Sequence, residues 1–215
     1  MKENKKTLWI AASGLDGSGK TTLVDNLYDW FTTEFGLKVY RDRLPHDKHI
    51  VNELLDASHD KYTDRLLFAV DNRIFGTRLR DILKSGEYDI VLTQRCFLDS
   101  FVHGAVQGYS YSWIEDLNRT SELPRTDVII HMVAEARTAY SRIRNDPDAD
   151  KFEYPAYIRK QEVETRRAYA ECETGNNIDL DPFNTAQHFA IDSTRKSTDE
   201  VFEIAKSQLL KLGIV

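Results

Sequence analysis

Eight consecutive residues, Gly14 to Thr21, have the types and spacing of a phosphate-binding loop. They comprise two glycines with four residues between them, followed by a lysine and a hydroxyl residue. Glycines let the backbone curl until successive N–H groups point at one anion, at a helix N-terminus whose dipole favours negative charge. We expect Lys20 to reach the β- and γ-phosphates of a nucleoside triphosphate and the Thr21 hydroxyl to bind Mg²⁺. The other residues of the expected cradle are Gly14, Asp16, Gly17, Ser18, Gly19 and Thr22.

The segments on either side of this loop have the structure that the motif needs. Leu8–Ser13 is apolar and typical of a buried strand. A helical pattern begins at Lys20 and continues to about Phe35, where Gly36 is placed to end a helix. A glycine-rich turn without a phosphate-binding role is the alternative, and the flanking strand and helix argue against it.

The rest of the chain alternates short apolar runs with longer helical stretches, which indicates an α/β fold. Further strands are predicted at Lys38–Arg41, Asp89–Thr93, Asp127–Val133 and His188–Ile191. Further helices are predicted at Thr63–Lys84, Leu98–Gln107, Ser112–Asn118, Glu135–Ile143, Pro155–Glu173 and Thr198–Leu212. We therefore predict a single domain over residues 1–215 with the P-loop NTPase fold, a five-stranded parallel sheet with helices on both faces.

Composition limits the classes of function. With 41% hydrophobic and 30% charged residues, the 215-residue chain is typical of a soluble globular protein. A net charge of −6 argues against a nucleic-acid partner, because binding to the phosphate backbone needs a basic face. The two cysteines give no disulfide framework, and no apolar run approaches the ~18 residues of a membrane helix. We expect a cytoplasmic protein that binds neither nucleic acid nor membranes.

Charged residues near the predicted strand ends suit a second substrate. Arg43 follows the second strand and Arg95 the third, and open α/β sheets bind ligands outside the carboxyl ends of their strands. A guanidinium fork suits a phosphate dianion. Asp16 stands inside the phosphate loop, where a carboxylate is a poor partner for phosphates, so we expect it to face away and accept a hydrogen bond from a sugar hydroxyl. The alternative for Asp16, Arg43 and Arg95 is that each side chain faces solvent and binds no substrate.

Six segments in chain order resemble the thymidylate kinase family, which moves the γ-phosphoryl group of ATP onto dTMP. They are Ser13–Thr22, Arg43–Pro45, Leu66–Ala69 with Arg73, Gln94–Arg95, Asp150–Glu153 and Ile191–Thr194. The resemblance covers most of the chain and implies ATP with Mg²⁺, small-molecule nucleotide substrates and a homodimer. It also implies that Asp16 holds the acceptor's 3′-hydroxyl and that Arg43 and Arg95 grip its phosphate.

The resemblance places the acceptor base against the long helix predicted over residues 63–84. In the family, the phenylalanine that matches Phe68 stacks on thymine, and an arginine four residues later reaches a base carbonyl. Here Asn72 occupies that later position and Arg73 follows it, which rotates the arginine ~100° around the helix. The identity of the base is therefore open, and a core position is the alternative for Phe68.

The segment after the third strand departs from the family in one position. Gln94 stands where the family has an aspartate, so Mg²⁺ must rely on Thr21, water and the phosphates. By resemblance, Asp99 and Ser100 match small polar residues that face the base, and His103 matches an aromatic residue that excludes a 2′-hydroxyl. The carboxylate of Asp99 would favour a base with hydrogen-bond donors, such as cytosine or a modified pyrimidine.

A polar interruption between two helices, Arg144–Asp150, is expected to form a lid over about residues 142–155. Phosphoryl transfer depends on positioning and on neutralising charge, which arginines on a closing lid can supply. The expected catalytic residues are Lys20, Arg95, Arg142 and Arg144. A solvated basic helix face is the alternative for the lid arginines.

These features predict a nucleoside monophosphate kinase that uses MgATP to phosphorylate dTMP, with Thr194 and Arg195 at the adenine by resemblance. One alternative is a kinase of another pyrimidine deoxynucleotide, a modified one, or a deoxynucleoside. Another is a nucleotide-binding regulatory protein with little or no catalysis, which Gln94 motivates. A GTPase switch is disfavoured, because the chain has no Asp-x-x-Gly after the phosphate loop and no Asn-Lys-x-Asp.

Overall fold

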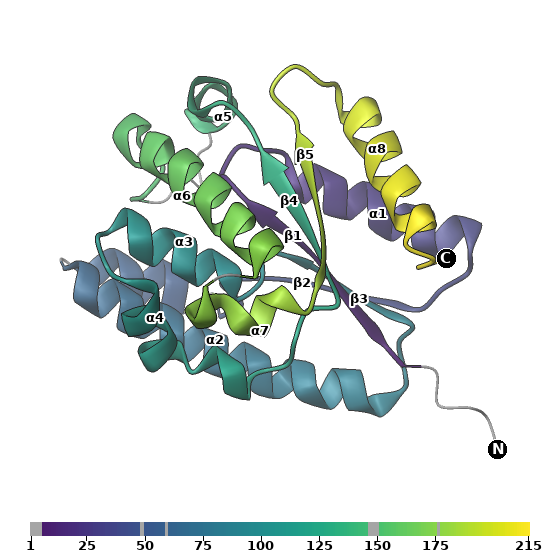
Figure 1. Ribbon diagram of the computed structural model, residues 1–215, viewed down its shortest axis with the longest axis horizontal. Coiled ribbons are helices and arrows are strands. Elements are labelled where there is room, and N and C mark those ends of the chain that lie inside the picture. Colours follow the sequence, from purple (N-terminus) through teal and green to yellow (C-terminus); the bar gives the residue numbers. More distant parts are fainter. Residues whose placement is uncertain (1–5, 48–49, 59, 146–150, 176) are drawn as a thin grey trace.

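Five parallel strands form the centre of the protein, in the order β2-β3-β1-β4-β5 (Figure 1). The computed structural model describes residues 6–47, 50–58, 60–145, 151–175 and 177–215. Its strands are β1 (Leu8–Gly14), β2 (Val39–Arg43), β3 (Ile90–Gln94), β4 (Val128–Val133) and β5 (Gln187–Asp192). Every neighbouring pair is parallel. The α/β fold that the sequence predicts is therefore confirmed.

Helices cover both faces of this sheet (Figure 1). One face carries α1 (Lys20–Glu34) and α8 (Thr198–Lys211). The other carries α2 (Lys61–Ser85), α3 (Leu98–Val106), α4 (Tyr111–Asn118), α6 (Pro155–Thr174) and the short α7 (Asp181–Asn184). The remaining helix, α5 (Ala136–Ile143), lies beyond the carboxyl end of β4 and packs on the phosphate loop, where Ala139 meets Leu15.

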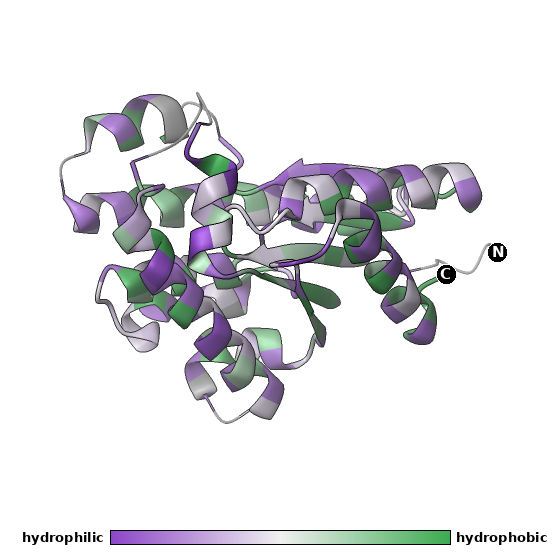
Figure 2. Ribbon diagram, turned by 90° about the horizontal axis from the view of Figure 1, so that it is seen from above, coloured by the Kyte–Doolittle hydropathy of each residue, from purple (hydrophilic) through white to green (hydrophobic). Residues whose placement is uncertain are grey.

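The core holds β1 rigidly in the middle of the sheet. Trp9 is fully buried between Phe75 and Phe97, with ring centroids 6.3 and 5.4 Å away. Its indole N–H donates to Thr93 Oγ1 at 2.9 Å, so the polar end of the ring is satisfied inside the core. Figure 2 shows hydrophobic residues along the strands and hydrophilic residues on outward helix faces. The strand that leads into the phosphate loop is thereby fixed on both sides.

The strand order opens a crevice at the carboxyl ends of β1 and β3. The chain leaves β1 through α1 on one face and leaves β3 through α3 on the other. At such a switch point the two connections diverge, and ligands bind between them. The phosphate loop and the residues after β3 therefore lie side by side.

Two element ends lie two residues from their predicted positions, for local reasons. β2 extends to Arg43, two residues beyond the predicted end, because it pairs with β3 as far as Arg43 opposite Gln94. Arg43 is therefore the last residue of a strand and does not follow it. α2 begins at Lys61 because the Asp60 carboxylate accepts hydrogen bonds from the backbone N–H groups of Tyr62 and Thr63. The structure also has a π-helix at Ile50–Leu55 and 3₁₀-helices at Thr120–Glu122 and Ile178–Leu180, which the sequence did not predict.

None of the helices in the described ranges combines the length and the apolar character that crossing a lipid bilayer requires. Cys96 and Cys172 are both buried, as free thiols. Burial raises the pKa of each thiol, that of Cys172 to about 12, so neither is a reactive thiolate near neutral pH.

Candidate nucleotide-binding site

A cavity of about 810 Å³ opens at the crevice between β1 and β3. Its wall combines the phosphate loop, the end of β3, the inner sides of α2 and α3, and residues before α6. Many of the residues predicted from the sequence line it: Asp16, Gly17, Gly19, Lys20, Thr21, Thr22, Arg43, Phe68, Asn72, Arg95, Asp99, Ser100, His103 and Arg142. Other predicted residues lie off this wall in the described structure: Gly14, Ser18, Arg73, Arg144, Thr194 and Arg195.

The phosphate loop has a backbone that requires glycine at Gly17. Its φ is 78°, and a Cβ there would lie 2.3 Å from the carbonyl oxygen of Ala139 in α5. The loop and α5 therefore approach as closely as they do because no side chain stands between them. Gly19, the N-cap residue of α1, has a φ of 93°, but a Cβ there would meet nothing closer than 4.0 Å.

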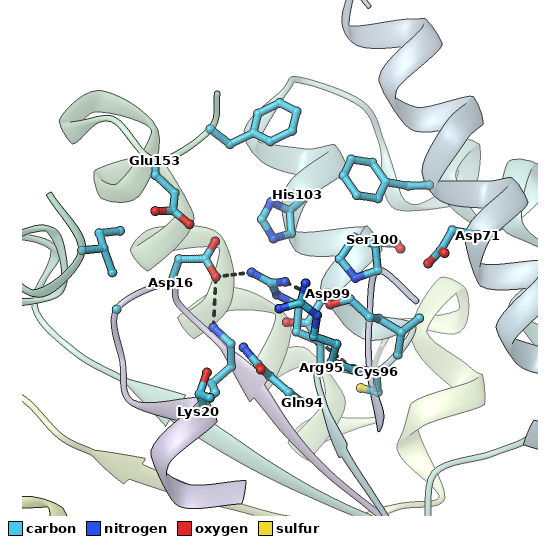
Figure 3. Close-up of a pocket in the computed structure, with 18 of the residues that line it drawn as sticks. Asp16, Lys20, Asp71, Gln94, Arg95, Cys96, Asp99, Ser100, His103 and Glu153 are labelled. Atoms are coloured by element: carbon cyan, nitrogen blue, oxygen red, sulfur yellow. Dashed lines mark hydrogen bonds and ion pairs between the residues drawn. The ribbon is translucent and has the colours of Figure 1, made fainter. Parts of the chain in front are cut away.

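Asp16, Lys20 and Arg95 meet in the middle of the cavity wall (Figure 3). Lys20 Nζ lies 3.1 Å from Asp16 Oδ1, and Arg95 Nη2 donates to the same oxygen. Lys20 Nζ also donates to the carbonyl oxygens of Gly14 and Leu15, at 2.7 and 2.8 Å. Asp16 therefore pairs with both cations, and its expected hydrogen bond to a sugar hydroxyl stays a prediction. A buried carboxylate beside one buried and one half-buried cation costs less than an unpaired carboxylate, because the opposite charges attract.

The pKa values of this cluster follow from burial and from the two ion pairs. Burial alone would raise the pKa of Asp16, but Arg95 and Lys20 together hold that pKa well below its usual range. Burial lowers the pKa of Lys20, and the charge of Asp16 opposes the shift. Asp16 is therefore a carboxylate at neutral pH, and it is available to accept hydrogen bonds.

Gln161 on α6 is a site residue that the sequence analysis missed. Its amide nitrogen donates to Asp16 Oδ2 at 3.1 Å and lies 3.3 Å from His103 Nε2. His103 Nδ1 in turn lies 2.8 Å from the Tyr157 hydroxyl. Burial lowers the pKa of His103 to about 3, so its imidazole is neutral and can accept from Gln161. No local motif marks Gln161, because it reaches the loop only through the packing of α6.

Asp99 has a different position from the one that the sequence predicts. Its Oδ1 accepts from the backbone N–H of Gly14 at 3.2 Å, and its Oδ2 accepts from that of Cys96 at 2.9 Å. Burial raises its pKa, while the positive charges of Lys20 and Arg95 oppose that shift. Both oxygens thus join the start of the phosphate loop to the segment after β3, and neither is held toward a base.

The loop after β2 is fixed to both β3 and α2. Arg95 has a φ of 70°, in the left-handed region, and its Nη1 donates to the carbonyl oxygen of Leu44 at 3.0 Å. A non-glycine residue in that region is strained, which is typical of a site whose surroundings impose the geometry. Asp71 on α2 accepts from the backbone N–H groups of His46 and Asp47. Asp71 is a second residue that the sequence analysis missed, and it holds the chain that follows Arg43.

The far end of the cavity is aromatic. Phe68 on α2 and Phe152 before α6 both line it, with ring centroids 6.2 Å apart. Asn72 lies on the same wall and is buried, whereas Arg73 pairs with Glu122 at 3.3 Å on the exposed side of α2. The helix rotation expected from the five-residue spacing is therefore observed, and the prediction that Arg73 faces the substrate is not supported.

Arg142 links the phosphate loop to the loop after β5. Its guanidinium donates to the carbonyl oxygen of Gly17 at 3.1 Å and to that of Ser193 at 2.8 Å. Arg144, one position beyond α5, is exposed and off the cavity wall. The predicted lid includes residues 146–150, which lie outside the described residues. After them, Lys151 Nζ donates to Asp64 Oδ1 at 2.7 Å and so ties this segment to α2.

Thr194 contacts Asp192 and the backbone of Glu135. It does not cap α8, whose N-cap residue is Ser197. The Thr194 hydroxyl donates to Asp192 Oδ1 at 2.5 Å and accepts from the backbone N–H of Glu135 at 3.0 Å. The start of α8 is stabilised by the capping box of Ser197 and Glu200.

The described residues suit a magnesium ion held mainly by phosphates. Thr21 is exposed on the cavity wall beside Lys20, at the start of α1. Among the described residues, no three His, Cys, Asp or Glu side chains gather as a metal site. Mg²⁺ characteristically keeps several waters and takes only one or two protein ligands together with substrate phosphates. One hydroxyl at this position is therefore compatible with the ion.

Comparisons with known proteins agree with this geometry. The sequence profile of the family described as Thymidylate kinase matches residues 13–180. A probable thymidylate kinase of Pyrobaculum aerophilum is 31% identical over 169 residues, which cover 76% of this chain and 84% of the relative. One of Sulfurisphaera tokodaii is 30% identical over 164 residues, 76% and 80% of the two chains. Probable thymidylate kinase 1 of Saccharolobus solfataricus is 28% identical over 163 residues, 74% and 84% of the two chains.

The contact between the phosphate loop and α5 predicts different effects for two glycine substitutions. Gly19→Ala should cost about 1 kcal/mol of unfolding free energy, the price of a positive φ alone. Gly17→Ala should cost at least about 2 kcal/mol more, because its Cβ also collides with a backbone carbonyl. Urea unfolding of the two variants measures this difference. Equal losses would contradict the close approach of α5.

Proposed function

Since the chain belongs to the thymidylate kinase family of phosphotransferases, we propose that it transfers the γ-phosphoryl group of ATP to dTMP, giving ADP and dTDP. The observation that carries the proposal is the Asp16 carboxylate held between Lys20 and Arg95. Lys20 belongs to the phosphate loop and Arg95 to the segment after β3, so the two cations mark the donor and acceptor halves of one cavity.

On the donor side, the backbone N–H groups of the loop and the N-terminus of α1 would hold the triphosphate. Lys20 would leave Asp16 and the two carbonyl oxygens that it now contacts and would bind the β- and γ-phosphates. Mg²⁺, held by the Thr21 hydroxyl, would neutralise charge on those phosphates. The proposal keeps Thr194 and Arg195 near the adenine, because the loop after β5 contacts the phosphate loop through Ser193 and Ser18.

On the acceptor side, Arg95 and Arg43 would bind the phosphate of dTMP. Asp16, released by the cations, would accept a hydrogen bond from the 3′-hydroxyl, with Gln161 keeping its second oxygen in place. An oxygen of the acceptor phosphate would then attack the γ-phosphorus in line, and the bond to ADP would break. His103 beside Gln161 would occupy the space that a 2′-hydroxyl needs.

The lid arginines complete the proposal. Arg142 already contacts Gly17 and is placed to reach a bound triphosphate, whereas Arg144 would have to move to do so. Gln94 carries no charge, so charge neutralisation in the transition state would depend on Lys20, Arg95 and the lid.

We also propose that the enzyme is cytoplasmic.

The direct test is ADP release measured by a coupled assay with MgATP and a panel of acceptors: dTMP, dUMP, dCMP, dGMP, UMP and the nucleosides. We expect the largest kcat/KM with dTMP. Lys20→Met should lower kcat by at least about 100-fold, because the charge on the transferred phosphoryl group loses its partner. Lys84→Met, which removes an exposed lysine at the end of α2, is the matched control and should keep wild-type activity.

Other outcomes of this assay would refute the assignment in distinct ways. A preference for dCMP or for a nucleoside would mean that the protein is a kinase with an acceptor other than dTMP. Absence of turnover with every acceptor, together with retained ATP binding, would point to a regulatory nucleotide-binding protein.

We further propose a homodimer formed by α2. Apolar side chains at four-residue spacing follow one exposed side of this helix, and we call them the α2 stripe: Tyr62, Leu66, Val70 and Ile74. Val70 is 51% exposed. A contiguous apolar strip on a soluble protein is typical of an interface. A second copy fits it, because a two-fold axis places the same stripe on both subunits, and the family resemblance implies a dimer.

Val70→Glu should convert the dimer to a monomer, because two carboxylates would face each other across the two-fold axis. Val163→Glu is the control, since Val163 is exposed on α6 away from the stripe. Sedimentation or light scattering at micromolar concentration measures the masses. If the wild type is a monomer, or if Val163→Glu alone dissociates it, the interface proposed here is wrong.

A further inference from the structure

A buried arginine on α2 that was not singled out from the sequence lies at the aromatic end of the cavity. Arg65 is only 3% exposed, and it lines the cavity one helical turn before Phe68. Its guanidinium carbon lies 4.4 Å from the centroid of the Phe68 ring and 6.0 Å from that of Phe152. Both ring faces offset part of the cost of burying the cation.

The position of Arg65 relative to the charge cluster separates it from the phosphate-binding residues. Its charge acts on His103, which lies between the aromatic end and Asp16. The aromatic end is the part of the cavity that suits a flat, apolar ring, and the Asp16 end is the part that suits phosphates. A planar ligand beside the Phe68 ring would therefore adjoin the Arg65 guanidinium, whose carbon is 4.4 Å from the centroid of that ring.

Asn72 supplies a matching acceptor, because its orientation is fixed by neighbours. Asn118 donates its amide nitrogen to the carbonyl oxygen of Ile114 at 2.8 Å, so its Oδ1 is left to accept. Asn72 Nδ2 donates to that oxygen and to Ser100 Oγ, each at 2.7 Å. Both amide protons are thus used within the protein, and Oδ1 of Asn72 is the atom that can accept from a ligand.

We propose that Arg65 and Asn72 read the base of the acceptor nucleotide, with Arg65 donating to a ring carbonyl and Asn72 Oδ1 accepting from the ring N–H. This assignment rests on the proposed function, in which the base is thymine, a pyrimidine with carbonyls on both sides of N3–H. Arg65 replaces Arg73 as the guanidinium at the base. Arg65 lies about one helical turn before Phe68, whereas Arg73, five residues after Phe68, is directed to Glu122 on the outside of α2.

Arg65→Gln should lower kcat/KM for dTMP by about 10- to 100-fold, chiefly by raising the KM for dTMP, with the KM for ATP within about two-fold of wild type. Arg65→Lys keeps the charge over the rings but lacks the fork, so it should recover only part of the loss. Arg80→Gln, which removes another α2 arginine bonded to the carbonyl oxygen of Glu122, is the control and should behave as wild type.

Asn72→Leu should lower kcat/KM for dTMP as well. Arg73→Gln tests the competing assignment, in which Arg73 contacts the base. A loss of dTMP affinity in Arg73→Gln as large as that in Arg65→Gln would overturn the proposal. So would a pair of Arg65 variants that lower the unfolding midpoint yet leave the KM for dTMP unchanged, because that result would mean a purely structural arginine.

Calorimetry with dTMP separates this inference from the proposed function. If the wild type binds dTMP without turning it over, the proposed function fails, and weaker binding by Arg65→Gln would still support the base-reading role. If the wild type does not bind dTMP, both proposals fail.

Discussion

One buried carboxylate shared by two cations is the constraint on which the rest of the site depends. Asp16 and Lys20 are buried and Arg95 is half-buried, and removing Asp16 would leave two neighbouring cations without the carboxylate that they share. The surrounding hydrogen bonds keep this cluster in place: Gln161 holds the free side of Asp16, and Asp99 joins the loop to the segment after β3. Substrate phosphates can replace the carboxylate as partners of the cations. The ion pairs are therefore stable without substrate and can be exchanged for contacts to phosphate when substrate binds.

The sheet brings these charges together. Lys20 and Arg95 are 75 positions apart in the chain, but β1 and β3 are neighbours, and Arg95 donates its backbone N–H to the carbonyl oxygen of Ala12 at 2.8 Å. The helices contribute the other parts of the site. α1 gives its N-terminus to the phosphate loop, α2 and α3 form the walls of the acceptor end, and α6 supplies Gln161. Glycine at position 17 allows α5 to pack directly on the phosphate loop.

Residues within a strand–loop–helix motif were predictable from the sequence, because local patterns dictate them. The five strands, the helices between them and the position of Arg95 directly after β3 follow from apolar runs and turn residues. The partners of those residues were not predictable. Gln161, Asp71 and Arg65 lie on helices with ordinary helical patterns. Only tertiary packing brings Asp71 and Arg65 to the cavity wall and Gln161 to Asp16. The ion pair between Asp16 and Arg95 was not predictable either, since the loop sequence does not reveal that Arg95 lies beside it.

A crystal structure of the protein with ADP, Mg²⁺ and dTMP bound tests the exchange of partners most directly. The account predicts that Lys20 Nζ, now 3.1 Å from Asp16 Oδ1, moves to the donor phosphates and that Arg95 moves to the phosphate of dTMP. The Asp16 carboxylate should then accept from the 3′-hydroxyl. Persistence of both ion pairs of Asp16, with the two nucleotides bound and Lys20 and Arg95 away from any phosphate, would contradict it.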